Sequence, residues 1–422
     1  MRYLVCFLLL TSMVACQNET QVFEQEPVER RQAFFERFQA ALIAPGKGWI
    51  MQYFPTGGES AGHNLFMNFN ATYEVTMGAS HAFTSNVYAE HVSRYGLTVE
   101  GAPVLHFTTY NAVLHSFSDP DLNEAAGDFE FIIADFTTDF IRLKGKRHNA
   151  DVCLTRLDDT DGEEYIRRAE ATKNALFALR SPALRLRVGD RAYTFGEGHT
   201  SVFKIREEGA DSVRNMAYIA LPDGFRLYAP FEAGDAKVQT FRWNDDRSLL
   251  ICSDAGVNAA IGSSVDDATA FFLSSLEMNS SYSWNVQPAA LHGVFADAYA
   301  RINASYQTQN QAFDGFVLTY KPGIQGLALS FKGRNAATPH EGAIGINLAL
   351  EAGFADRVRF TDRNAADANG QRFLNNYDGA RDFLSALCAG SYTVTVESPL
   401  QLSKFKFASD LNPDDRFELT LY

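Results

Sequence analysis

The sequence lacks an excess of basic residues and, beyond residue 16, any long hydrophobic run. It has 51 acidic and 37 basic residues, which gives a formal net charge of -14. A surface of this sign repels phosphate backbones, so we expect no nucleic-acid partner. A helix that crosses a bilayer needs about 20 apolar residues, and no stretch after residue 16 supplies them. The sequence therefore predicts no transmembrane helix after that point.

Cysteines are few and follow no regular spacing. Of the five, Cys6 and Cys16 lie at the N-terminus, which leaves Cys153, Cys252 and Cys388. These three show no CxxC spacing and no adjacent His pair, so neither a zinc knuckle nor a disulfide framework is indicated. We expect buried free thiols, while one bridge among the three stays open in an oxidising compartment.

Catalytic spacing is missing as well. Nine histidines occur without an HExxH or HxH pattern, which removes the usual signature of a zinc site. Residues 58–62 match GxSxG, but strand patterns flank them on both sides, whereas a nucleophile elbow needs a helix after the serine. The paired carboxylates of a glycosidase meet in space and leave no spacing to find. We predict no catalytic residue and keep a glycan or peptide hydrolase with dispersed carboxylates as an alternative.

The first sixteen residues have the features of a bacterial lipoprotein signal peptide. Arg2 is positively charged, residues 3–10 form a short apolar run, and residues 13–16 read Met-Val-Ala-Cys, as in a lipobox. We expect residues 1–16 to be the signal, with Cys16 retained and acylated. Residues 17–26 are polar and acidic, which predicts a flexible tether. The expected location is the bacterial cell envelope, with attachment through the lipid anchor.

The remaining chain has the composition of a β-rich protein. Hydrophobic residues make up 46% of the full sequence and aromatic residues 13%, enough for two packed cores with many strands. Period-two alternation marks half-buried strands at residues 141–144, 152–155, 184–188, 392–396 and 417–422. Apolar residues at helical spacing predict three amphipathic helices, around residues 34–42, at 163–180 and at 289–306. The predicted fold class is mainly β with a few helices (α+β), arranged as antiparallel barrels or sandwiches.

An internal echo suggests duplication. Residues 48–55 and 315–322 share the pattern Gly, aromatic, β-branched, aliphatic, any, Tyr, any, Pro, and each follows a predicted helix. We therefore predict two related β-rich halves, each opened by an amphipathic helix. The first is expected at residues 27–270, with the internal helix 163–180, and the second at 271–422, opened by the helix 289–306.

Aromatic and histidine residues supply the candidate ligand-binding groups. Flat apolar rings can form the floor of a sugar- or peptide-binding site, although the same residue types also pack in protein cores. Two histidines bracket residues 107–114 and would share a role if a turn brought them together. The candidates are Trp49, Tyr53, Tyr110, His106 and His115.

One acidic segment has the spacing of a calcium loop. Asp119, Asp121, Asn123 and Glu130 occupy its first, third, fifth and twelfth places. Glu124 stands in the sixth place, where a true EF-hand needs a glycine to turn sharply. The sequence therefore predicts no EF-hand, but it retains these four residues as a looser calcium site. No other cofactor is expected.

Several segments together resemble the Bacteroidetes family described as domain of unknown function 4302. They are the first predicted helix and residues 48–55, 64–69, 103–120, 127–131, 143–146 and 224–231. The resemblance covers nearly all of the chain after residue 16. It implies a lipoprotein encoded near outer-membrane nutrient-uptake systems of the SusC and SusD type. It implies no reaction, because that family has no assigned catalytic residues.

These observations lead to a functional expectation with two alternatives. We expect a non-enzymatic binding or accessory lipoprotein of the outer membrane that assists nutrient uptake, with a glycan or peptide ligand and SusC- or SusD-like partners. The alternatives are the hydrolase described above and a structural envelope protein. Whether the protein lies on the surface or the periplasmic face stays open.

Overall fold

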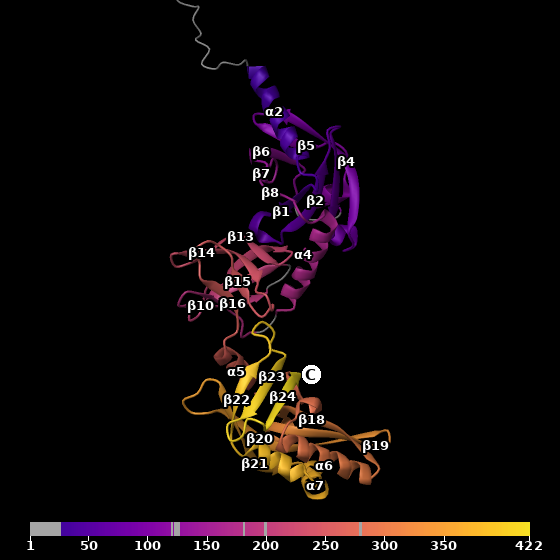
Figure 1. Ribbon diagram of the computed structural model, residues 1–422, viewed down its shortest axis with the longest axis vertical. Helices are drawn as coiled ribbons and strands as arrows, with labels where there is room; N and C mark the ends of the chain where they lie inside the picture. Colours follow the sequence, from indigo (N-terminus) through magenta and orange to yellow (C-terminus); the bar gives the residue numbers. More distant parts are fainter. Residues whose placement is uncertain (1–26, 120, 122–126, 180–181, 198–200, 278–280) are drawn as a thin grey trace, which may run out of the picture. The chain divides into compact units, whose positions relative to one another are not determined.

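The computed structural model describes residues 27–119, 121, 127–179, 182–197, 201–277 and 281–422. The predicted signal peptide, the tether, Cys16 and Asn123 lie outside the described residues. Strands of the described part form three closed antiparallel barrels of eight strands each (Figure 1). The expectation of a mainly β fold with a few helices is confirmed. Among the described helices, none combines the length and the apolar character needed to cross a bilayer.

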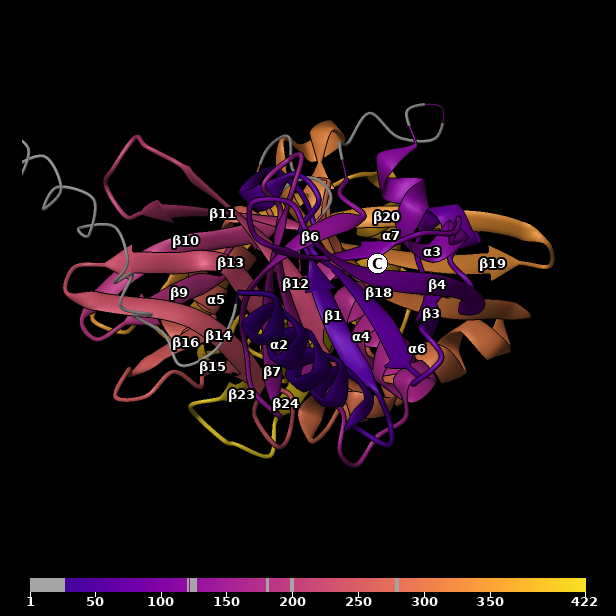
Figure 2. The ribbon, with the colours of Figure 1, turned by 90° about the horizontal axis from the view of Figure 1, so that it is seen from above.

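The first barrel is a meander whose last strand pairs with its first. It comprises β1 (Trp49–Tyr53), β2 (His63–Phe69), β3 (Glu74–Ala79), β4 (Ala89–Val99), β5 (Pro103–Phe107), β6 (Glu130–Phe136), β7 (Phe140–Gly145) and β8 (Asp151–Arg156). Helix α2 (Pro27–Ile43) lies against these strands (Figure 2). Phe38 of α2 is fully buried beside Phe136, and the indole of Trp49 donates a hydrogen bond to the carbonyl of Leu42 at 2.8 Å. The predicted first helix therefore covers one side of the core.

Short elements complete this part of the chain. They are α3 (Ala112–His115) and the 3-10 helices η2 (Gly57–Glu59), η3 (Ala82–Thr84) and η4 (Ser116–Ser118). Residues 58–62, which match GxSxG, fall on η2 and the turn after it rather than between a strand and a helix. The local context of a nucleophile elbow is therefore missing.

The second barrel follows helix α4 (Gly162–Phe177), which corresponds to the helix predicted at 163–180. It comprises β9 (Arg185–Val188), β10 (Arg191–Glu197), β11 (Val202–Glu207), β12 (Arg214–Leu221), β13 (Gly224–Ala233), β14 (Ala236–Trp243), β15 (Leu250–Cys252) and β16 (Ala259–Gly262). Strand β9 pairs with both β10 and β16, which closes the sheet. Aromatic rings fill the interior, including Phe203 stacked on Tyr218 at 4.0 Å.

The third barrel carries most of the remaining helices, with α6 beside β18 and α7 beside β20 (Figure 1). Its strands are β17 (Ser283–Val286), β18 (Gln311–Lys321), β19 (Gly326–Asn335), β20 (Thr338–Leu350), β21 (Arg357–Ala366), β22 (Ser391–Val396), β23 (Lys404–Ser409) and β24 (Arg416–Leu421). Its helical elements are α5 (Val265–Ser274), η5 (Pro288–Ala290), α6 (Val294–Thr308), η6 (Pro322–Ile324), α7 (Ala368–Asn376) and α8 (Ala380–Leu387). Helix α6 is the helix predicted at 289–306, and it starts later because η5 occupies the first residues.

The interior of the third barrel is filled by side chains. Its core contains a void of about 10 Å³ lined by apolar residues such as Leu318 and Phe360. A void of this size has room for about one water molecule at most. Among the residues that the structure describes, the centre of this barrel is therefore a packed core.

The number of barrels differs from the two halves expected from the sequence. The predicted first half, residues 27–270, contains two barrels, and the predicted second half contains one. Alternation predicts strands, but closure depends on registers between strands, which alternation does not specify. The echo segments contain β1 and the C-terminal part of β18. Strand β1 lies between β8 and β2, whereas β18 lies between β17 and β19. In the third barrel, β17, which precedes α6, therefore occupies the position that the last strand, β8, occupies in the first barrel.

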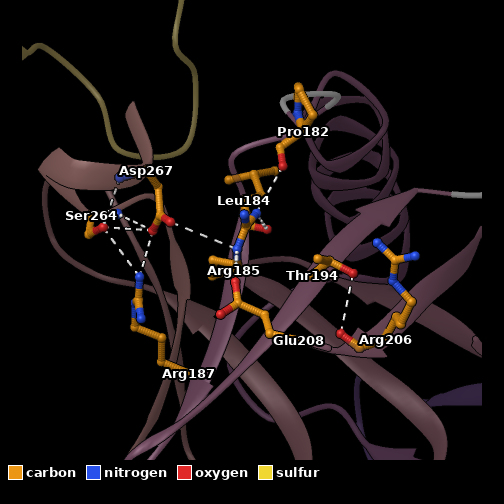
Figure 3. Close-up of polar contacts among 9 residues, drawn as sticks. All are labelled: Pro182, Leu184, Arg185, Arg187, Thr194, Arg206, Glu208, Ser264 and Asp267. Atoms are coloured by element: carbon orange, nitrogen blue, oxygen red, sulfur yellow. Dashed lines mark hydrogen bonds and ion pairs between the residues drawn. The ribbon is translucent and has the colours of Figure 1, made fainter. Parts of the chain in front are cut away.

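A polar network joins α5 to strand β9 (Figure 3). Ser264 and Asp267 form a capping box at the start of α5, in which each backbone N–H donates to the other side chain at 3.1 Å. The Asp267 carboxylate also pairs with Arg187 at 2.5 Å and with Arg185 at 3.8 Å, and Arg185 contacts Glu208 at 2.6 Å. Burial acts to raise the pKa of Asp267, but the Ser264 hydrogen bonds and the two arginines outweigh it and lower this pKa.

We expect Asp267→Asn to lower the free energy of unfolding by about 1 to 2 kcal/mol, because two ion pairs are lost and the carboxylate that accepts from the Ser264 N–H becomes a neutral, weaker acceptor. Denaturation of the full chain measures this, with the neighbouring Asp266→Asn as the control. The folded pKa of Asp267 lies below its ordinary 3.8, so its contribution is present above pH 3.8 and is lost as the pH falls further. If the difference in unfolding free energy between Asp267→Asn and the native chain increased as the pH fell, this assignment would be contradicted.

Candidate functional site

The first barrel presents three aromatic rings in a column on its surface. The ring of His115 lies 4.9 Å from that of Phe129, stacked at an interplanar angle of 27°, and 5.4 Å from the tilted ring of Tyr110. Tyr110 is 64% exposed and Phe129 37% exposed, whereas His115 between them is half-buried. We call Tyr110, His115 and Phe129 the aromatic platform. Two outer rings facing solvent give it surface that a flat ligand can cover.

The turn between β5 and β6 builds one side of the aromatic platform. Asn111 is fully buried and caps α3, since its Oδ1 accepts from the N–H of Val113 at 3.0 Å. Its Nδ2 donates to the carbonyl of His91 at 3.1 Å and to Oγ of Ser93 at 3.0 Å. The short helix that follows then returns His115 beneath Tyr110. Asn111 therefore fixes the backbone on which both rings stand.

The imidazole of His115 is held in its neutral form. Burial lowers the pKa of His115 from the ordinary 6.5, and hydrogen bonds to the backbone of Asn111 and Phe107 only partly oppose this effect. Nδ1 of His115 lies 3.0 Å from the backbone nitrogen of Asn111 and 3.2 Å from its carbonyl oxygen, so the backbone of Asn111 fixes the orientation of the ring. At neutral pH the middle ring is therefore an uncharged, flat group.

A buried carboxylate holds the opposite side of the aromatic platform. Asp128 precedes Phe129 in sequence and is only 2% exposed. Its side chain accepts hydrogen bonds of 2.8 to 3.5 Å from the backbone N–H groups of Arg147, His148 and Ala150. Gly145 is required beside it, because a Cβ atom there would collide with the carboxylate. The β7–β8 turn and Phe129 are thereby tied together.

Tyr53, a predicted ligand-binding residue, supports Asp128 from within the core of the first barrel. It is fully buried on β1, and the N–H of Asp128 donates to its hydroxyl at 2.5 Å. Burial raises the pKa of Tyr53 well above its ordinary value, so the phenol stays protonated. Trp49 is also fully buried. Neither side chain has surface that a ligand in solution can reach in this structure.

The two bracketing histidines lie in different surroundings. His106 is on β5, opposite Gly96, where a Cβ atom would lie 2.6 Å from its Nε2. Glycine at 96 therefore leaves room for the His106 ring. No ring contact or hydrogen bond joins His106 to His115 within the described residues. Of the five predicted ligand-binding residues, the structure brings Tyr110 and His115 together.

The predicted calcium ligands do not form a cluster in the part of the chain that can be described. Oδ1 of Asp119 accepts from the N–H of Asp121 at 3.0 Å, and Glu130 pairs with Lys146 at 3.0 Å. Among the described residues, no three His, Cys, Asp or Glu side chains are arranged to hold a metal ion. Asn123 lies outside these residues, so the calcium site stays a prediction.

Groups suited to catalysis are not apparent at the aromatic platform. The carboxyl groups with displaced pKa values, Glu100, Asp246 and Asp267, are all displaced downward, opposite to what a general acid needs. Cys153, Cys252 and Cys388 are free thiols, but only Cys252 is buried as expected, whereas the other two are partly exposed. Burial raises the pKa of Cys388 to about 11. A thiol with a raised pKa is a poor nucleophile at neutral pH.

Phe129 and Asp128 were not identified as site residues from the sequence. Phe129 lies in an alternating segment that reads as an ordinary strand, and the signal available was the Gly-Asp pair before it. Such a pair marks a turn but does not reveal which backbone amides the carboxylate will accept.

We expect Asp128→Ala to destabilise the first barrel by about 2 to 4 kcal/mol, because buried N–H groups lose their acceptor. Hydrogen exchange should show faster exchange at the amides of Arg147 and His148 than in the native chain. Asp139→Ala, which removes an exposed carboxylate in the same barrel, serves as the control. Unchanged protection in Asp128→Ala would show that the carboxylate does not hold this turn.

Residues 19–245 match the family described as Domain of unknown function (DUF4302), a range that contains the first barrel and the second as far as β14. No curated protein matches the chain. Since the match covers more than half of the 422 residues, the chain belongs to the family of the domain of unknown function DUF4302.

Proposed function

We propose that this chain is a lipid-anchored binding or accessory protein of a bacterial outer membrane that holds a nutrient ligand on the aromatic platform. The observation that carries the proposal is the exposed ring column of Tyr110, His115 and Phe129 on a firmly braced surface. In this proposal the protein serves an uptake system of the SusC and SusD type in a member of the Bacteroidetes.

A glycan is the ligand class that best fits the aromatic platform. Sugar rings have flat C–H faces that pack on aromatic rings, and their hydroxyls stay in water at the rim. The formal charge of -14 favours neutral over anionic ligands. The neutral His115 adds no charge to the column. A peptide is the second ligand class, because aromatic surfaces also accept apolar side chains.

Glycan binding to the full chain is measured by calorimetry, with peptides and calcium in parallel. We expect saturable binding of a glycan that Tyr110→Ala and Phe129→Ala each weaken about tenfold, equal to ~1.4 kcal/mol for a lost stacking contact. Tyr422→Ala is the matched control, because Tyr422 is 80% exposed on the third barrel. Equal affinity in all variants would reject the platform as the site.

The same incubations separate the binding protein from the hydrolase. An unchanged glycan recovered after binding supports a binding role. Release of a smaller sugar or peptide would instead establish a hydrolase. If neither glycans nor peptides bind, the proposal fails in favour of a structural role in the envelope.

The lipid anchor is tested separately. In a bacterium that processes lipoproteins, we expect Cys16→Ser to move the protein out of the membrane fraction and to abolish labelling by a fatty-acid analogue. Cys153→Ser is the control and should remain membrane-bound and labelled. Labelling of Cys16→Ser would place the acyl group on another residue.

A further inference from the structure

The third barrel has a second hollow that the aromatic platform does not involve. It has a volume of about 520 Å³ and lies among the end of α5, the η6–β19 turn and strands β20 and β21. Apolar side chains form much of its wall, including Leu273, Leu276, Leu327 and Leu348. Sites for small organic ligands have this size and this mixture of apolar walls with a few polar groups.

An irregularity in β21 presents Arg363 to this hollow. On β20 Gly345 pairs with Ala365, but the next residue, Ile346, pairs with Asp362, so the register shifts at Arg363 and Asn364. Asn364 has a φ of 51°, in the left-handed region that few residues other than glycine adopt. Bulges of this kind redirect a side chain away from the regular alternation. The bulge therefore accounts for the presence of Arg363 in a wall that also contains Glu277, Gln325 and Asn347.

Arg363 is half-buried and lacks a carboxylate partner among the described residues. Its guanidinium has one hydrogen bond, from Nη1 to the carbonyl of Ile324 at 3.4 Å. In contrast, Arg357 and Arg359 of the same strand contact Asp410 and Glu351 at 3.3 and 3.9 Å. A partly desolvated cation without a counter-charge gains free energy when an anion binds.

Gly326 makes room for this cation. A Cβ atom at position 326 would collide with Nη1 of Arg363, so any larger residue there would displace the guanidinium. The φ of Gly326 lies outside the left-handed region, so its role here is to leave space for the guanidinium in its present position. The glycine and the bulge thus act together on the position of one charged group.

We propose that this hollow binds a small amphiphilic carboxylate, whose anionic group pairs with Arg363 and whose apolar body packs on the leucines. Glu277 also lines the hollow and would repel an anion. Its side chain is exposed, so solvent screens that repulsion, while Arg363 is partly shielded. The site favours an anion near Arg363 and limits its affinity through Glu277.

Octanoate is the probe, titrated into the full chain by calorimetry. We expect saturable binding that Arg363→Gln weakens at least about tenfold, as for a lost charge-assisted hydrogen bond. Gly326→Ala should weaken binding although Arg363 keeps its charge. Glu277→Gln should tighten it by roughly two- to fivefold, because a like charge is removed.

Two control variants and a neutral probe distinguish octanoate binding at this hollow from binding elsewhere on the chain. Arg359→Gln removes an arginine of the same strand and should leave octanoate binding unchanged, as should Tyr110→Ala on the aromatic platform. Octanamide, which has the same chain without the charge, should bind at least about tenfold more weakly than octanoate. Equal binding of both probes, equal binding by Arg363→Gln, or no saturable octanoate binding by the native chain would overturn the proposal, and none of these results bears on glycan binding.

Discussion

Closure of each eight-stranded sheet is the constraint on which the rest of this structure depends. A strand such as β9 has partners on both sides, β10 and β16, so its backbone groups are satisfied within the sheet and no edge remains. Closure also encloses an interior that side chains must fill. Aromatic residues do so, as in the stack of Phe203 on Tyr218 and the packed core around Phe360. Once the interior is filled, binding surface has to come from the outside and from the connections.

The features that point to function lie at such places. The aromatic platform stands on the connection between β5 and β6, which leaves the sheet through Asn111 and returns through Asp128. The hollow of the third barrel depends on a bulge in β21 that redirects Arg363. In the first case hydrogen bonds of Asn111 and Asp128 with the backbone set the position of the rings, and in the second an irregularity of the strand sets the position of the charged group. The shared architecture thus supports different surfaces on different barrels.

The sequence predicted the local elements well, since α2, α4 and α6 each have an apolar face that repeats at helical spacing. It did not predict three barrels, because strand register and closure arise from contacts between distant residues. The candidate site was predicted in part. Tyr110 and His115 were found, but Trp49 and Tyr53 lie on β1, where all five residues are buried. Alternation does not identify such a strand, and neither the partners of Asp128 nor the bulge at Arg363 leaves a pattern in the sequence.

The position of the closing strands has a consequence for folding kinetics. The pairing that closes the second barrel joins residues such as Val188 and Ala259, which are closer in sequence than Trp284 and Leu421, the residues joined where the third barrel closes. Loop-closure entropy makes distant pairings slower to form. During synthesis, β17 cannot pair with β24 until all the other strands of the third barrel have been made, because β24 is the last strand of the chain. The third barrel is therefore expected to spend the longest time with an unpaired edge, which makes it the part most prone to aggregation while the chain folds.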